Sequence, residues 1–122
     1  MNRDHLQELA RRIESASVLD IDLAVVALKA LRAALPQASP EVRLGVVDSA
    51  DMALHLVVRT LPDWSVVLEG TAREPGHWTC TLQPSGVRDD EEVIGIGRAA
   101  TPSLALIAAL LRVVSVQSKG YG

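Results

Sequence analysis

Large aromatic side chains are nearly missing from this sequence, which has no phenylalanine, one tyrosine and two tryptophans. Alanine, valine, leucine and isoleucine supply most of its hydrophobic residues, so we expect an aliphatic core held by many small contacts. Cysteine is equally scarce: Cys80 is the only one, which excludes an internal disulfide and a thiolate metal cluster. At 122 residues, one domain is expected, with enough buried surface to fold without such crosslinks.

A surplus of positive charge is also absent. Twelve Lys and Arg residues stand against fifteen Asp and Glu residues, which gives a net charge of −3. Nucleic-acid binding generally needs excess positive charge to displace counterions from phosphates, so nucleic acid is an unfavoured partner. The opening segment MNRDHLQELARR is charged and amphipathic and lacks the apolar centre of a signal peptide, so we predict a cytoplasmic protein.

No hydrophobic run is long enough to span a bilayer, although residues 104–116 contain a single charge, Arg112. As a helix this run would cover about 20 Å, whereas the hydrocarbon core of a membrane is about 30 Å thick. Thr101 and Pro102 predict the helix start, because a hydroxyl caps the first turn and proline fits the first helical position. We therefore predict a core helix and no membrane contact.

This carboxyl-terminal helix has more apolar surface than one sheet face needs. One predicted stripe covers the sheet and comprises Leu104, Ile107, Ala108 and Leu111. A second stripe requires another partner and comprises Leu106, Leu110 and Val113. Burying the second stripe is worth on the order of 5 kcal/mol, at ~1.5–3 kcal/mol for each side chain. Burial against the chain's own helices is the favoured interpretation, and a homodimer built on the second stripe is the alternative.

Three more helices are predicted ahead of the sheet. They cover residues 3–16, a segment from Asp20 or Asp22 to about Leu35, and a segment from Asp48 or Ser49 to just before Pro62. Their apolar stripes are Leu6, Leu9, Ala10 and Ile13 in the first; Leu23, Val26, Ala27, Ala30 and Ala34 in the second; and Met52, Ala53, Leu56 and Val57 in the third. The first two are expected to form a hairpin over residues 1–35. Residues 36–47 are predicted to be a connection, with an edge strand over 42–47 as the alternative.

In the segments that begin at residue 64 the hydrophobic residues recur at every second position, which is the period of a strand. WSVVLEG at 64–70 and HWTCTLQ at 77–83 alternate apolar and polar residues, and Pro75-Gly76 between them predicts a turn, so the pair should be an antiparallel hairpin. A third strand is predicted in VIGIG, where Ile94 and Ile96 would continue the apolar face and the two glycines would lie on the other face.

These elements predict an α+β fold in the order α-α-α-β-β-β-α. A three-stranded antiparallel sheet would be packed by about four helices in a layered α/β sandwich. The whole chain, 1–122, would form one domain, with residues 48–116 as an α-β-β-β-α unit and residues 117–122 as a flexible tail.

The sequence offers few candidates for chemistry. The side chains that could bind a soft metal are His5, His55, His77 and Cys80. His77 and Cys80 are near each other, but three residues apart on a strand they face opposite sides, so no metal site is predicted. No Gly-x-Ser-x-Gly motif surrounds a serine, and no catalytic residue is predicted.

Two further segments have structural interpretations. GIGRAAT at 95–101 lacks the third glycine and the Lys-Ser/Thr pair of phosphate-binding loops, so no cofactor is predicted. Its glycines are interpreted as positions where a strand and a helix pack closely. The acidic run DDEE at 89–92 is interpreted as a solvated loop.

Three short motifs follow one another in the second half of the sequence. A helical segment rich in alanine and leucine leads into Leu-Pro-Asp-Trp over 51–64, HWTCTL follows at 77–82, and TPSLALIAALL occupies 101–111. In these motifs the chain resembles the phage ABA sandwich domain family, and its first half is similar to the helix pair of that family. It departs from the family at 31–47, where LRAALPQASPEVRLGVV replaces an aromatic, extended insert. The resemblance implies a small α/β sandwich from a phage, prophage or other mobile element and supplies no catalytic residue.

The predicted function is therefore protein–protein interaction by a small, non-enzymatic, phage- or prophage-type accessory protein that modulates a host or defence system. The candidate interaction residues are Leu106, Leu110, Val113, Arg98 and Arg112. The alternative is a nucleotide- or nucleic-acid-binding module, because β-β-β-α is also the order in double-stranded-RNA-binding domains. That alternative would use the helix start at 97–104 with Thr101, where Arg98 stands alone in place of several lysines.

Overall fold

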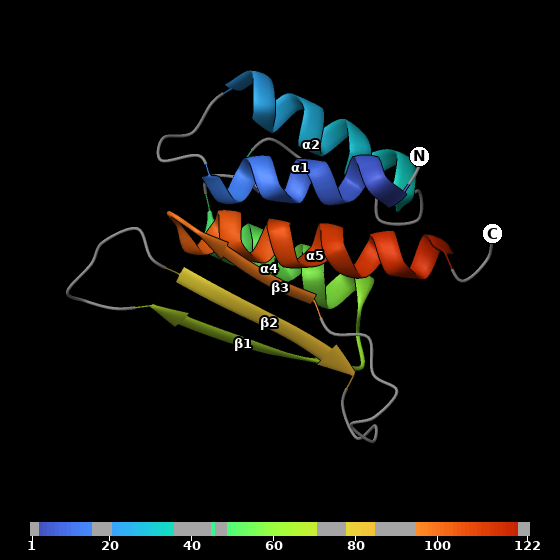
Figure 1. Ribbon diagram of the computed structural model, residues 1–122. Helices are drawn as coiled ribbons and strands as arrows, with labels where there is room; N and C mark the ends of the chain where they lie inside the picture. The colour runs from blue at the N-terminus through green and yellow to red at the C-terminus, as the bar shows by residue number, and fades with distance from the viewer. Residues whose placement is uncertain are drawn as a thin grey trace.

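The computed structural model describes residues 3–15, 21–35, 45, 49–70, 78–84 and 95–119. Within these ranges the helices are α1 (Arg3–Ser15), α2 (Ile21–Ala34), α4 (Ala50–Thr60) and α5 (Pro102–Lys119). The strands are β1 (Trp64–Gly70), β2 (Trp78–Pro84) and β3 (Gly95–Ala99). The element order confirms the predicted α+β fold with a three-stranded antiparallel sheet (Figure 1).

The strands are ordered β1-β2-β3, so β2 is central and β1 and β3 form the two edges. The register is regular: Val67 of β1 pairs with Thr81 of β2, and Thr81 pairs with Ile96 of β3. Cys80 and Leu82 on β2 are fully buried, which identifies their side of the sheet as the inner face. All four described helices lie on that side (Figure 1).

Helix α5 runs through the middle of the molecule (Figure 1). It contacts the other three described helices and all three strands, with α1 and β3 as its most extensive neighbours. From Ser103 to Ser115 every side chain is buried except Arg112, which is partly exposed. Leu106, Leu110 and Val113 are at most 1% exposed, which confirms the prediction that they are buried within one chain. A homodimer built on these three residues is wrong, because the chain's own elements already cover them.

The face that α5 turns toward the sheet differs from the predicted one. A Cβ atom added at Gly95 or at Gly97 would lie 2.6 Å from backbone atoms of Ala109. The helix residues over β3 are therefore Ala105, Ala108, Ala109 and Val113. Of the predicted sheet-covering stripe only Ala108 lies there, because small residues let the two backbones approach closely.

The larger residues of that predicted stripe lie elsewhere on α5. Helical spacing puts Leu104 and Leu111 on the same side as Ser115. The Ser115 hydroxyl accepts a hydrogen bond from the Gln7 amide of α1, at 3.4 Å. This side of α5 therefore packs against α1.

Strand β3 presents the opposite faces from those predicted. Gly95, Gly97 and Ala99 face inward and are buried, whereas Ile96 faces outward and is 39% exposed. The interpretation of the glycines as close-packing positions is confirmed, but their assignment to the open face and that of Ile96 to the packed face are wrong. Helix α5 lies so close to β3 that no side chain fits at Gly95 or Gly97.

The predicted stripe of α1 is confirmed, since Leu6, Leu9, Ala10 and Ile13 are all buried. The predicted stripe of α2 is confirmed at Ala27 and Ala30, which are buried, and Leu23 and Ala34 are partly buried against the core. The buried face is nevertheless rotated relative to the prediction: Val26 is 37% exposed, and Leu28, Leu31 and Leu35 are buried together with Ala24. This rotation gives the core three leucines, which bury more apolar area than the predicted alanine-rich stripe. The two helices run antiparallel, as the predicted hairpin requires (Figure 1).

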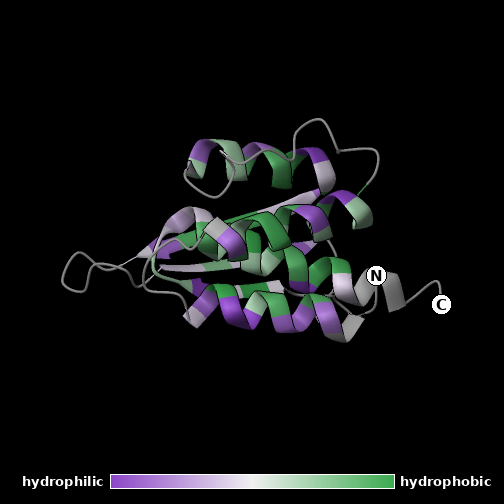
Figure 2. Cartoon of the chain, turned by 90° about the horizontal axis from the view of Figure 1, so that it is seen from above, coloured by the Kyte–Doolittle hydropathy of each residue, from purple (hydrophilic) through white to green (hydrophobic). Residues whose placement is uncertain are grey.

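The predicted starts of α4 and α5 are confirmed. The Ser49 hydroxyl accepts a hydrogen bond from Met52 N and caps α4, and the Thr101 hydroxyl accepts one from Leu104 N and caps α5. Ala53, Leu56 and Val57 of α4 are buried, but Met52 is partly exposed. Hydrophobic residues gather in the middle of the molecule, and the outer helices carry hydrophilic stretches (Figure 2).

Several predicted features lie outside the described residues: the Pro75-Gly76 turn, the 89–92 loop, Ile94 and His77. In the 42–47 segment only Gly45 is described, and it is helical. Helix α5 continues to Lys119, so residues 117–119 belong to the helix and not to the predicted tail. Among the described residues no helix is both long and apolar enough to cross a membrane.

Candidate functional site

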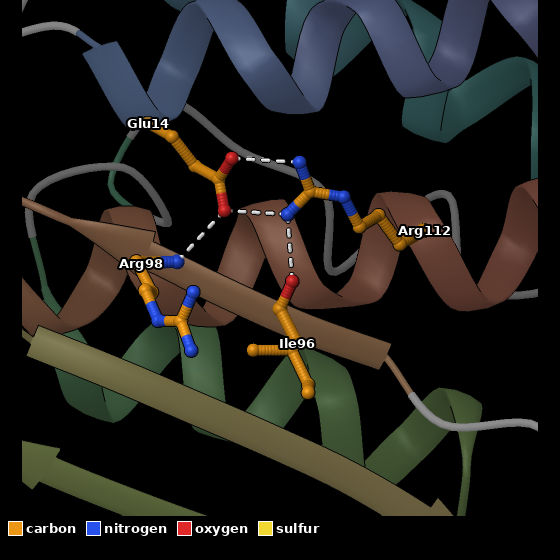
Figure 3. A pocket seen from close by; sticks show the side chains of 4 residues that line it. All are labelled: Glu14, Ile96, Arg98 and Arg112. Atoms are coloured by element: carbon orange, nitrogen blue, oxygen red, sulfur yellow. Dashed lines mark hydrogen bonds and ion pairs between the residues drawn. The ribbon is translucent and has the colours of Figure 1, made fainter.

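A half-buried ion pair joins three elements where α1, β3 and α5 meet (Figure 3). Glu14 lies in the last turn of α1 and Arg112 in the second half of α5. Both guanidinium nitrogens donate to the Glu14 carboxylate: Arg112 Nη2 to Oε1 at 2.6 Å and Nη1 to Oε2 at 2.5 Å. Only 28% of the Arg112 side chain and 21% of the Glu14 side chain are exposed. The bidentate geometry is the strongest arrangement that these two groups can adopt.

The same pair covers the backbone of the β3 edge. Arg98 N donates to Glu14 Oε2 at 2.8 Å, and Arg112 Nη1 also donates to the Ile96 carbonyl oxygen at 2.6 Å. The Arg98 amide and the Ile96 carbonyl point away from β2, toward the side of β3 on which a further strand would otherwise pair. The carboxylate and the guanidinium thus make the hydrogen bonds of a missing strand, which is one way to protect a sheet edge.

The surroundings of Glu14 change its pKa in opposing directions. Burial acts to raise the pKa of Glu14, but the hydrogen bonds from Arg112 and from Arg98 N, together with the charge of Arg112, outweigh it and lower the pKa below its ordinary value. The hydrogen bond to Glu14 raises the pKa of Arg112 further, against the effect of burial. Both groups are therefore charged at neutral pH, and Glu14 is poorly suited to accept or donate a proton in catalysis.

The ion pair forms the floor of a shallow, open pocket of about 350 Å³, lined by Glu14, Ile96, Arg98 and Arg112. The Arg98 side chain points away from Glu14 and lies over the sheet (Figure 3). Arg112 is already neutralised by Glu14, so Arg98 supplies the remaining positive charge of the pocket. Such an arrangement can hold a polar group of a partner at the pocket rim.

The structure separates the five predicted interaction residues into two groups. Arg98 and Arg112 come together in the pocket, although Arg98 is exposed and Arg112 is largely engaged with Glu14. Leu106, Leu110 and Val113 are buried in the core and reach no surface of the chain. Only the two arginines can therefore contact a partner of the folded protein.

Glu14 is not among the residues predicted from the sequence. A single arginine in an otherwise apolar helix signals that an acidic partner exists, because a lone buried charge is costly. Fifteen acidic residues could have been that partner. A second signal was available: Glu14 stands in the last turn of α1, where the helix dipole disfavours a negative charge unless another group compensates it.

The candidate metal ligands that the structure describes lie apart from one another. His5 and His55 are exposed on α1 and α4, and Cys80 is buried on the inner face of β2. Among the described residues no group of three or more His, Cys, Asp or Glu side chains is placed to hold a metal ion. Burial raises the pKa of the Cys80 thiol to about 12, so it stays neutral and unreactive at physiological pH.

Comparison with known proteins gives no relative. No family model matches the chain, and neither a curated protein nor a solved structure is significantly similar to it. The resemblance to the phage ABA sandwich domain family therefore stays a prediction.

The role of the ion pair can be measured with Glu14→Gln, which leaves Arg112 without a charged partner. We expect the free energy of unfolding at neutral pH to fall by about 1.5–3 kcal/mol, as for hydrogen bonds to charged groups. Because folding lowers the pKa of Glu14, its stabilisation is present above the unfolded pKa of 4.5 and is lost as pH falls through the folded pKa. Urea unfolding of both proteins across this range should show the two stabilities converge in acid.

Glu8→Gln is the matched control, because Glu8 and Arg11 form an ion pair that is mostly exposed to solvent. This change should cost less than about 1 kcal/mol. A deficit of Glu14→Gln that stayed constant into acid would contradict the assigned role of the carboxylate.

Proposed function

We propose that this chain is a non-catalytic protein-interaction domain that binds its partner through the outer face of its sheet. Within the described ranges, no helix lies on that face. Val67 of β1 and Ile96 of β3 are 49% and 39% exposed, and Thr81 lies between them in register. This Val67–Thr81–Ile96 row is the observation that carries the proposal.

The composition of the face supports this function. The Val67–Thr81–Ile96 row, whose two ends are apolar, is called the apolar row below. The row Glu69–Thr79–Arg98 lies on one side of it, and the pair Ser65 and Gln83 lies on the other. An apolar centre with a polar and charged rim is the usual anatomy of a protein–protein interface. The rim includes Arg98, so the pocket beside Glu14 lies at the border of this face.

The charges of the same region disfavour the nucleic-acid alternative. Glu14 neutralises Arg112, and Glu69 occupies the same row as Arg98. Phosphate binding needs several uncompensated cations along a groove, whereas among the described residues of this face Arg98 is the only cation and Glu69 lies in the same row, across Thr79. The phage or prophage origin and the modulation of a host or defence system remain part of the proposal on the resemblance alone.

Affinity capture with tagged variants tests the proposal. Ile96→Lys places a charge in the apolar row, and a charge that loses water in an apolar contact costs enough to reduce partner recovery at least about tenfold. Val26→Lys is the matched control, because Val26 is similarly exposed but lies on α2. Capture from an extract of the native host, quantified by mass spectrometry, should lose the partner only with Ile96→Lys. Equal recovery with all three proteins would contradict the proposed surface.

A further inference from the structure

The two edges of the sheet differ in how their backbone groups are used. At the β3 edge the Glu14–Arg112 pair occupies the Arg98 amide and the Ile96 carbonyl. At the β1 edge, no described strand lies beyond Trp64–Gly70. The residues from Val67 to Gly70 are exposed along this edge. Proteins commonly protect such edges with charged side chains, above all lysine, with proline or with a bulge; β1 has one charged residue, Glu69, and no lysine, proline or bulge.

Along a strand, the backbone N–H and C=O groups of successive residues point alternately to its two sides. This alternation shows which residues of β1 direct these groups to the side of the strand away from β2. Arg98 N points away from β2, so its partner Thr79 directs its backbone groups to β1, where it faces Glu69. The neighbouring residues of β1 therefore direct their amides and carbonyls outward. These residues are Val66, Leu68 and Gly70.

The sequence of β1 is complementary to itself. In an antiparallel pair of two β1 strands centred on Val67, residue 67 faces its own copy and Val66 faces Leu68. Ser65 then faces Glu69, so that no two carboxylates meet, and Trp64 faces Gly70. In this register the outward groups of Val66 and Leu68 pair with each other, as antiparallel geometry requires.

The ends of this pairing also fit. Gly70 has no side chain, and the ring of Trp78 from β2 lies over it, since a Cβ atom there would be 2.6 Å from that ring. Trp64 of a second copy would therefore meet Trp78. Aromatic pairs of this kind favour association beyond the area they bury.

From these observations we propose that the β1 edge binds a second copy of this chain, which produces a continuous six-stranded antiparallel sheet. This inference rests on the proposed function, because it identifies a second copy of the chain as one partner. The dimer would join the outer sheet faces of the two copies into one surface. The apolar row then runs from Ile96 of one copy through both Val67 side chains to Ile96 of the other. An interface of one strand pair is small, so we expect a reversible dimer with a dissociation constant in the range of about 1–100 µM.

The symmetric position of residue 67 allows a charge-swap experiment. Val67→Lys and Val67→Glu each place like charges opposite each other and should each weaken the dimer at least about tenfold. An equimolar mixture of the two variants should associate again as a heterodimer, because lysine then faces glutamate. Sedimentation velocity from about 1 µM to about 1 mM gives the masses, and tryptophan fluorescence should change with concentration only where dimers form.

Val58→Lys is the matched control, since Val58 is 50% exposed on α4 and should leave the dimer intact. Circular dichroism and thermal melting establish that each variant is folded. A wild-type monomer at about 1 mM, a stable Val67→Lys dimer, or a mixture that fails to associate would each overturn the proposal. A wild-type monomer that still captures a partner through Ile96 would overturn this inference and leave the proposed function standing.

Discussion

Gly97→Ala is expected to lower the free energy of unfolding by about 3 kcal/mol, which is a large fraction of the stability of a small domain. The added Cβ would lie 2.6 Å from Ala109 N and 3.0 Å from the Cβ of Ala108. The closest obstacle is the backbone of α5, which cannot rotate aside as a side chain can. Helix and strand would have to separate, and the contacts of the central helix with β3 would weaken.

The expected loss of stability is opposite in sign to the usual effect of replacing glycine by alanine, so the test discriminates clearly. In an unconstrained strand, glycine to alanine stabilises a protein by about 0.4–1 kcal/mol, because alanine loses less backbone entropy on folding. Ile96→Ala is the control in the neighbouring position and should cost less than about 1 kcal/mol, since Ile96 is exposed. Urea unfolding monitored by circular dichroism measures all three proteins. A Gly97→Ala protein as stable as wild type would show that α5 does not lie against β3.

Leu110→Ala should cost a comparable amount, about 3–5 kcal/mol, because Leu110 is fully buried in the helix that most other elements contact. Removal of its side chain leaves a cavity that the surrounding helices and strands can fill only partly. For a domain of this size the melting temperature should fall by roughly 10–20 °C.

The same substitution on the surface provides the control. Leu54 is 40% exposed on α4, and Leu54→Ala should cost less than about 1 kcal/mol. Calorimetry measures both changes, and sedimentation velocity measures the association state. If Leu110→Ala altered only the association state and left the monomer as stable as before, Leu110 would be an interface residue and the packing of α5 described above would be wrong.

The local pattern of the sequence was sufficient for most of the element order. Hydrophobic period distinguishes helix from strand, and Ser49, Thr101 and Pro102 mark helix starts through chemistry that acts within one turn. The stripe of α1 was predicted correctly because its apolar and charged residues separate cleanly around the helix. Such signals depend on neighbours in the chain, so they can be read without the fold.

The stripe of α2 and the faces of β3 could not be read in this way. Helix α2 carries apolar residues around most of its circumference, so packing alone decides that Leu28 and Leu31 are buried and Val26 is not. In β3, alternation is equally consistent with either face, and isoleucine is ordinarily a better core residue than glycine. The close approach of α5 reverses that choice, since only glycine fits beneath Ala109.

By itself, the sequence determined that this chain forms an α+β domain, and that the segment following Thr101 is a helix too short to cross a membrane and too apolar to lie in water. Tertiary structure alone decided the partner of the one charge in that helix. Glu14 is 98 residues from Arg112 in sequence, and the two meet because α1 and α5 pack side by side. Tertiary structure likewise decided that Glu14 and Arg112 cover one edge of the sheet, whereas no described strand pairs with the other. Edges and ion pairs are relations between distant segments, and periodicity along the chain does not encode them.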